Sequence, residues 1–381
     1  AATVVRAVDA RRPGEVRRHG DVVFPGVARD AELVGGVLYV LRDAGEVATL
    51  TSLGVRGGGV QSLDEARLPG RAAELAASSA GLAAVTVGEE AGRSVTRVAW
   101  VDLPMDTPGA LHVKESADLA MGFPVWERGH ARVVSVDDDA GVRLVGCATH
   151  ACGPGEPSLL RIVDFGAAEP RAVGALELTA RGGLPVTRFD GDTLYVAEPP
   201  ARRDGERTSS ELRLVRLDDP ARPRLAGRVS VRGTVASLVP RGESVFALGW
   251  TGSPGTAVRI ALHEIDVKRP AAPRVRAGVV FGSDWTWSIA EDEGAALSFD
   301  PGSSFAAVPF TAWTTDDGRV AAGTQVFDLG SDGVRAAGTF PSERGVQRAV
   351  FVGGRLVTVG ADGIAVLDYA KARETPVLEL E

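Results

Sequence analysis

Four short apolar runs between Glu211 and Trp250 constrain the fold more than any other part of the chain. Their spans are Leu212 to Leu217, Leu225 to Val231, Val235 to Val239 and Val245 to Trp250. Pro220 and Pro223 stand between the first two runs. Because proline fixes φ and removes a backbone donor, the chain must turn there. Runs this short with breaks this close are typical of strands, so the stretch predicts a four-stranded antiparallel meander.

The same pattern recurs along the chain: an apolar strand ending in an acidic residue, a turn with proline, a second strand that carries glycine, and then a hairpin. A lone small sheet cannot bury its faces, so such units need neighbours of their own kind. Equivalent strand ends at Asp164, Arg216 and Glu264 lie 52 and 48 residues apart, close to the roughly 40 to 50 residues of a propeller blade. We therefore predict an all-β propeller of four-stranded antiparallel blades, with residues 1–381 as a single domain.

The number of blades depends on the two ends of the chain. The sequence contains seven predicted inner hairpins but eight outer pairs, because each end carries an outer pair. Seven blades follow if one terminal pair completes the last sheet and the other lies outside the ring. Eight follow if the N-terminal pair belongs to a blade whose inner strands precede it or were not identified. We predict seven, with an extra strand pair in residues 1–28 that can close the ring.

Composition limits the partners and the compartment. The chain is 44% hydrophobic and 24% charged, as in globular proteins, and has a net charge of -8. Nucleic acids and anionic membranes both need a basic face, so this charge argues against them as general partners. No run of 18 apolar residues is present, which predicts no membrane span. The start at Ala1-Ala2-Thr3 fits either a leader already removed or a sequence that begins within a longer protein.

The two cysteines, Cys147 and Cys152, lie in one predicted loop together with His150. A disulfide between them would close a small loop, which stabilises the fold by roughly 2 kcal/mol in the chain-entropy model. Such a bridge favours a secreted, periplasmic or cell-surface location. Free thiols and a metal site are the alternatives, although two cysteines and one histidine are too few for a structural zinc site. We predict the disulfide.

Three stretches in the second half of the chain carry a family resemblance. They are Arg259 to Asp266 followed by Pro270 and Pro273, Trp287 to Phe310 with Phe299-Asp300-Pro301 inside it, and Val346 to Phe351 followed by Leu356 to Val359. These stretches resemble the secreted bacterial β-propeller domain family that is distantly related to WD40 proteins, and the Asp-x-x-x-Pro turns are similar to LVIVD repeats. The resemblance implies an exported propeller and no particular activity.

Motifs that would carry catalysis or bind a metal are scarce. The clusters Asp137–Asp139, Asp190–Asp192 and Asp316–Asp317 lack the Asp-x-Asp-x-Asp-Gly spacing of a compact calcium loop, and they fall where hairpin turns belong. The five histidines show no short paired spacing, and no P-loop, dinucleotide fingerprint or nucleophile elbow is present. We predict no catalytic motif, no cofactor and no metal. The alternative is a cluster assembled from distant residues across the ring.

Three tryptophans are the best candidates for a binding surface. Trp126, Trp285 and Trp287 all fall in predicted connections from an outer strand to the next inner strand. Such connections cross one face of a propeller near the central channel, and large amphipathic rings there can contact a ligand. The alternative is that these rings wedge between blades and cover the core. Arg348, just before a predicted inner strand, either faces the channel or pairs with a turn carboxylate.

Two classes of function remain. The first is an exported, non-enzymatic binding or scaffolding module that presents one face to a protein, peptide or glycan, and the scarcity of catalytic motifs favours it. The second is a propeller-based enzyme, a lyase or hydrolase, whose residues converge at the mouth of the central channel. We predict the first. A carboxylate or histidine close to an arginine in the channel, with perturbed pKa values, would support the second.

Overall fold

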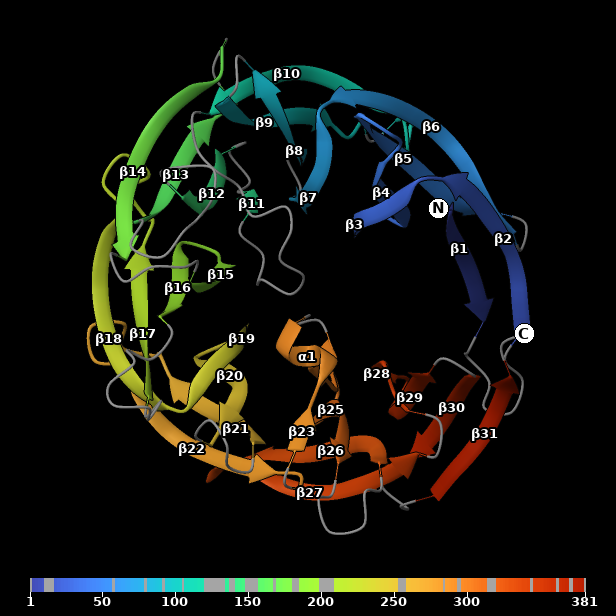
Figure 1. Cartoon of the computed structure of the whole chain (residues 1–381), viewed down its shortest axis with the longest axis vertical. Coiled ribbons are helices and arrows are strands. Elements are labelled where there is room, and N and C mark those ends of the chain that lie inside the picture. The colour runs from blue at the N-terminus through green and yellow to red at the C-terminus, as the bar shows by residue number, and fades with distance from the viewer. Residues whose placement is uncertain are drawn as a thin grey trace.

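The computed structural model of the protein is built of antiparallel sheets around a central axis (Figure 1). The prediction of an all-β propeller is confirmed. The described residues are 2–9, 17–56, 59–78, 81–90, 93–104, 106–119, 134–136, 141–147, 157–166, 169–179, 185–198, 209–252, 258–283, 285–292, 296–313, 320–342, 345–360, 363–369 and 373–379. None of the helices in these ranges is long and apolar enough to cross a membrane.

Seven sheets form the blades, and their strands are in sequence order from the inside of the ring to its rim. Blade one has β3 (Val27–Val34), β4 (Val37–Asp43), β5 (Val47–Arg56) and β6 (Gly59–Pro69). Blade two has β7 (Arg71–Ala77), β8 (Leu82–Glu90), β9 (Arg93–Asp102) and β10 (His112–Leu119). Blade three has β11 (Val134–Val136), β12 (Gly141–Cys147), β13 (Ser158–Asp164) and β14 (Arg171–Thr179). Blade four has β15 (Val186–Asp190), β16 (Thr193–Glu198), β17 (Ser209–Arg216) and β18 (Arg224–Arg232).

The remaining sheets complete the ring. Blade five has β19 (Thr234–Arg241), β20 (Ser244–Thr251), β21 (Arg259–Asp266) and β22 (Arg274–Phe281). Blade six has β23 (Trp285–Trp287), β24 (Ser298–Phe299), β25 (Phe305–Trp313), β26 (Val320–Gly330) and β27 (Gly333–Ser342). Blade seven has β28 (Arg348–Val352), β29 (Arg355–Gly360), β30 (Gly363–Asp368) and β31 (Arg373–Glu379). An eighth, two-stranded sheet is formed by β1 (Ala2–Asp9) and β2 (Arg17–Pro25).

This topology gives the ring two distinct faces. The turns between first and second strands and between third and fourth strands lie at one end of each blade, which we call the hairpin face. The connections from one blade to the next lie at the other end, the connection face. Each of four such connections turns on a glycine with positive φ, namely Gly26, Gly70, Gly233 and Gly282. At Gly26 a Cβ would also lie 1.8 Å from the Asp43 carbonyl oxygen, so no other residue fits there.

The stretch predicted as a single meander is divided between two blades. Its first two strands are β17 and β18 of blade four, and its last two are β19 and β20 of blade five. The division falls at Gly233, where a φ of 87° turns the chain from the rim of one blade to the inside of the next. Sequence periodicity identified the strands but could not show which of them share a sheet, because the turn at Gly233 resembles any hairpin turn.

The core is a series of interfaces between adjacent blades. One cluster joins blades four and five through residues such as Leu214 and Leu238, and another joins blades five and six through residues such as Leu262 and Phe327. The inner strand β19 is therefore buried on both sides, since all residues from Thr234 to Leu238 are buried. No blade can bury its own faces, which explains why the ring is needed for stability.

Glycines in the outer strands make room for the turns of the next blade. A Cβ on Gly174 of β14 would lie 1.9 Å from the Pro220 carbonyl oxygen, and one on Gly227 of β18 would lie 2.2 Å from that of Pro270. Both prolines belong to the turn between third and fourth strands of the following blade. The recurrent glycine and the recurrent proline turn are thus two halves of one contact between blades.

Blade six departs from the regular pattern. Its inner strand is broken into β23 and β24, with the short helix α1 (Ile289–Asp292) between them. Ser288 caps this helix, because its hydroxyl accepts a hydrogen bond from the Ala290 N–H at 3.1 Å and donates one to the Pro309 carbonyl at 2.5 Å. The apolar pattern of the sequence predicts an inner strand from Ala295 to Asp300, and the structure shortens it to β24. Glu264 and Asp328, which are equivalent strand ends, lie 64 residues apart in the sequence, and this long interval predicts an insertion. The insertion includes β23 and α1.

Candidate functional site

The candidate site lies on the connection face at blade six. Trp285 and Trp287 were predicted in a connection, and this was wrong: the structure places both on β23, paired with Trp313 and Thr311 of β25. A backbone hydrogen bond from Thr286 N–H to the Val258 carbonyl at 2.9 Å anchors β23 to blade five. Thr286 is buried, so the two tryptophans project from the opposite side of the strand.

A third tryptophan extends this surface. Trp313 lies directly opposite Trp285 in the register of β23 and β25, and directly paired residues project on the same side of a sheet. The three rings are 40% to 50% exposed. Together Trp285, Trp287 and Trp313 form what we call the tryptophan platform. Sequence reasoning missed Trp313, because its pairing with Trp285 follows only once β23 is known to be a strand.

Helix α1 lies next to the platform on the inner side of the ring. It follows Trp287 directly, contacts β19, β20 and β25, and projects towards the middle of the ring (Figure 1). Its residues Ile289 and Ala290 pack into the core between blades five and six, so the helix is held by the scaffold. Blade six therefore brings irregular backbone to the inner wall of the propeller.

Arg348 is the first residue of β28, the inner strand of blade seven, and so it lies at the connection face. Its side chain is partly buried, and burial lowers the pKa of the guanidinium from its ordinary value. It donates a hydrogen bond to the Gln347 carbonyl oxygen at 3.1 Å. Arg348 was predicted just before an inner strand, and the structure places it at the first residue of that strand. The role of Arg348 in binding stays a prediction.

Several predicted features lie outside the described residues. Trp126 is one of them, and so is Cys152. Cys147 ends β12, but its side chain is not described. The structure therefore does not test the predicted disulfide. Within the described part of the chain, no group of three or more potential metal-binding side chains is gathered.

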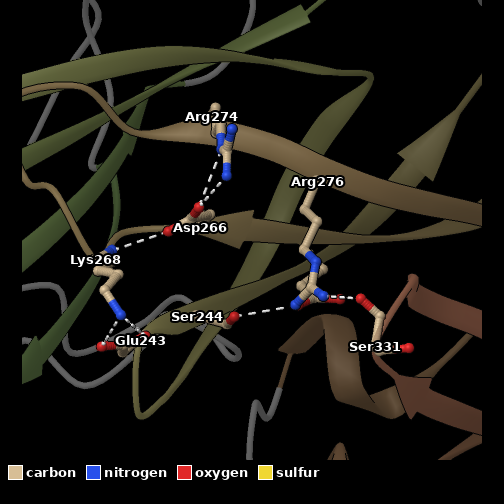
Figure 2. A network of polar contacts seen from close by, with 8 residues as sticks. Glu243, Ser244, Asp266, Lys268, Arg274, Arg276 and Ser331 are labelled. Carbon is tan, nitrogen blue, oxygen red and sulfur yellow. Dashed lines mark hydrogen bonds and ion pairs between the residues drawn. The ribbon is translucent and has the colours of Figure 1, made fainter.

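A polar network on the hairpin face joins blades five and six (Figure 2). The buried Glu264 carboxylate accepts hydrogen bonds from Arg276 Nη1 at 3.0 Å and from Ser244 Oγ at 3.1 Å. Arg276 also donates to the Ser331 carbonyl oxygen of blade six. At the surface, Lys268 pairs with Glu243 at 3.0 Å. Because every cation here already serves a contact within or between blades, we interpret the network as structural.

A second polar cluster on the hairpin face joins three blades. The buried Asp300 carboxylate of blade six accepts hydrogen bonds from Ser303 Oγ at 2.6 Å and from Tyr369 Oη of blade seven at 2.5 Å. Arg241 of blade five donates to the Asp300 carbonyl at 3.2 Å and stacks over the Phe299 ring. These hydroxyl donors, that of Ser303 first, lower the pKa of Asp300. The Phe-Asp-Pro motif thus has a structural role in this chain.

Comparisons with known proteins agree on the fold. The family model described as the β-propeller domain matches residues 212–372. No curated protein sequence matches the chain. Among solved structures, Sqt1 from Chaetomium thermophilum is similar with a TM-score of 0.55 and 14% identity, over 92% of this chain and 84% of that chain. This similarity shows the fold alone.

Some of the other similar solved structures are enzymes. The periplasmic gluconolactonase PpgL of Pseudomonas aeruginosa has 14% identity and a TM-score of 0.45, over 88% of this chain and 99% of that one. Acylaminoacyl peptidase of Pyrococcus horikoshii has 12% identity and a TM-score of 0.43, over 93% of this chain and 52% of that one. The prediction of a non-enzymatic module is contradicted, because enzymes are among the solved structures similar to this chain. At such low similarity, neither protein assigns an activity or a substrate. The chain is a β-propeller, and its residues 212–372 match the β-propeller domain family.

Proposed function

We propose that the protein is a propeller-based enzyme, a hydrolase or lyase, with its site at the mouth of the central channel on the connection face. The observation that carries this proposal is the broken inner strand of blade six. Breaking an inner strand gives up ladder hydrogen bonds in the most buried layer of the ring. Irregular segments held by a rigid scaffold are where functional residues concentrate.

Arg348 gives the proposed site its charge preference. A partly desolvated guanidinium attracts an anion more strongly than an exposed one, because less water screens the pair. Its planar fork also suits the two oxygens of a carboxylate or phosphate. We infer that the substrate is anionic and that Arg348 binds the negative charge that is present or develops during the reaction. The tryptophan platform would hold the apolar surface of the same substrate.

The test is a screen of substrates with carboxylate or phosphate groups, including anionic glycosides, lactones and uronate polymers. We expect turnover of one class, and we expect Arg348→Ala to reduce kcat/KM by about 100-fold, as for loss of one charge-stabilising donor. Arg355→Ala is the matched control, because Arg355 is exposed on the hairpin face of the same blade. No turnover in any class, or equal losses in both variants, would reject the proposal.

We further propose that the protein is exported and that its repeats are related to LVIVD and WD40 repeats. The Asp-x-x-x-Pro turn from Asp266 to Pro270 supports the relationship, since Asp266 accepts a hydrogen bond from the Lys268 N–H at 3.1 Å and so shapes the turn. The two closely spaced cysteines support export.

The predicted disulfide gives export a direct test. Protein recovered from the periplasm or medium without reductant should have a mass two hydrogens below that of the reduced form. Replacing Cys147 and Cys152 together by serine should lower the free energy of unfolding by roughly 2 kcal/mol. The single Cys147→Ser variant should lose the same amount, because either change removes the whole bridge. Full labelling of both thiols in unreduced exported protein would contradict the disulfide.

A further inference from the structure

The sector of the ring between blades seven and one contains only an outer strand pair in the part of the chain that the structure describes. In Figure 1, β1 and β2 lie at the rim in this sector, with β6 on one side and β31 on the other. Each of the other seven sectors also has strands on the inside. Along its inner edge β1 has no strand partner among the described residues, since it pairs only with β2.

Blade one is only half covered on the side that faces this sector. Its β4 residues Leu38 and Val40 pack against Val5 and Val22 of the outer pair. Leu33 of β3 is paired with Leu38 and therefore projects on the same side. The outer pair does not reach it, and Leu33 is among the most exposed large apolar residues described.

Blade seven is exposed along its inner strand on the side that faces the same sector, whereas its two middle strands are covered there. In its inner strand β28, Ala349 and Phe351 are buried in the cluster shared with blade six. Val350 and Val352 alternate with them and so project away from blade six. On the outer pair, Val4 and Val23 are paired with each other and project away from blade one.

The inner half of the sector holds no described strand, and the apolar residues that border the sector are exposed. Leu33, Val350, Val352, Val4 and Val23 are 44% to 70% exposed. By contrast, β19 lies between two complete blades and is buried on both sides from Thr234 to Leu238. Apolar faces together with a free strand edge are the two features that favour pairing with an added strand.

We propose that this eighth-sector slot, bordered by Leu33, Val350, Val352 and the inner edge of β1, binds an antiparallel β-hairpin of a partner protein. The seven complete sectors show what fills such a space in this ring: an antiparallel pair of strands, of which the second is largely buried on both sides. The bound hairpin would pair with β1 and extend the apolar interface that the outer pair already forms with blade one. Backbone hydrogen bonds to β1 would supply affinity, and the exposed apolar residues of β3 and β28 would select for apolar side chains.

The test uses a cyclised peptide with residues 234–251, the inner hairpin of blade five, as the probe. Cyclisation is needed because an isolated hairpin is only marginally stable in water. We expect saturable binding to the full chain by fluorescence anisotropy. Hydrogen exchange of the β1 amides should slow on binding, which adhesion to an apolar surface would not cause.

Variants of the slot provide the controls. Leu33→Asp and Val350→Asp, combined, should weaken binding of the peptide at least tenfold, since a carboxylate would be buried without a partner. Leu225→Asp is the matched control, because Leu225 is similarly exposed on the outer strand β18, and it should leave binding unchanged. Circular dichroism should show that all variants remain folded.

Three results would overturn the proposal. The first is no saturable binding of the peptide, and the second is equal weakening by Leu225→Asp. The third is a concentration-dependent dimer of the unliganded protein that the slot variants abolish, because a second copy would then cover the slot.

Discussion

Replacing Gly227 by alanine is expected to lower the free energy of unfolding by about 2–3 kcal/mol. The added Cβ would lie 2.2 Å from the Pro270 carbonyl oxygen and 2.9 Å from Cδ of Pro273. Both atoms belong to a turn that proline makes stiff, so the turn as a whole must move. That movement would separate blades four and five at the rim. Chemical denaturation followed by circular dichroism measures the loss.

Gly338→Ala is the matched control for this prediction. Gly338 lies on β27, also an outer strand, and a Cβ there would meet no atom within 4 Å. The same substitution should therefore leave stability within about 0.5 kcal/mol, or raise it slightly, because alanine reduces the conformational entropy of the unfolded chain. If both substitutions lowered the free energy of unfolding equally, the glycines would be needed for the backbone conformation of the strands and not for the contact between blades.

The sequence predicted the repeating part of this fold well, for a physical reason that Gly227 illustrates. Short apolar runs, proline turns and glycines are local signals, and a ring of equal blades repeats them many times. Asp164 and Arg216 are the last residues of the third strands β13 and β17, and Glu264 lies two residues before the end of the third strand β21. Regular spacing therefore sufficed to identify the architecture.

The candidate site was predicted less well, because it lies where the repeat fails. Trp285 and Trp287 were identified from their chemistry. The strand that they occupy has only three residues, which is too short to show a periodic pattern in the sequence. Trp313 and α1 were missed, since their positions follow from pairing across the insertion and from contacts with blade five. Such long-range pairings are set by the whole ring and leave no local pattern.

The second large effect is expected for Asp300→Ala, which should lower the free energy of unfolding by about 3 kcal/mol. The substitution removes the acceptor for Ser303 Oγ, for Tyr369 Oη and for the Gly302 N–H, which lies 3.0 Å away. Hydrogen bonds to a charged group each contribute about 1.5–3 kcal/mol, and donors left buried without a partner cost more. Because Tyr369 belongs to blade seven, the loss also weakens the junction of blades six and seven.

The pH dependence separates this effect from a simple packing defect. The hydroxyl donors lower the pKa of Asp300 in the folded protein, whereas an unfolded aspartate titrates near about 3.9. The folded state therefore binds fewer protons than the unfolded state, and the stabilisation is complete above that unfolded value. It is lost as the pH falls through the lower, folded pKa. The difference in stability between the native protein and Asp300→Ala should be constant from about pH 5 to pH 8 and should shrink in more acidic solution.

Asp328→Ala supplies the comparison for Asp300. Asp328 lies in the same blade and pairs with Arg335 at 2.6 Å and with Ser304 Oγ at 3.0 Å, but both contacts are at the surface. Exposed ion pairs contribute little, so its loss should cost less than about 1 kcal/mol. If Asp328→Ala lowered the free energy of unfolding as much as Asp300→Ala, the stabilisation would come from the turns within blade six. A much larger cost at Asp300 would show that contacts between blades hold the ring together, because only Asp300 reaches blade seven.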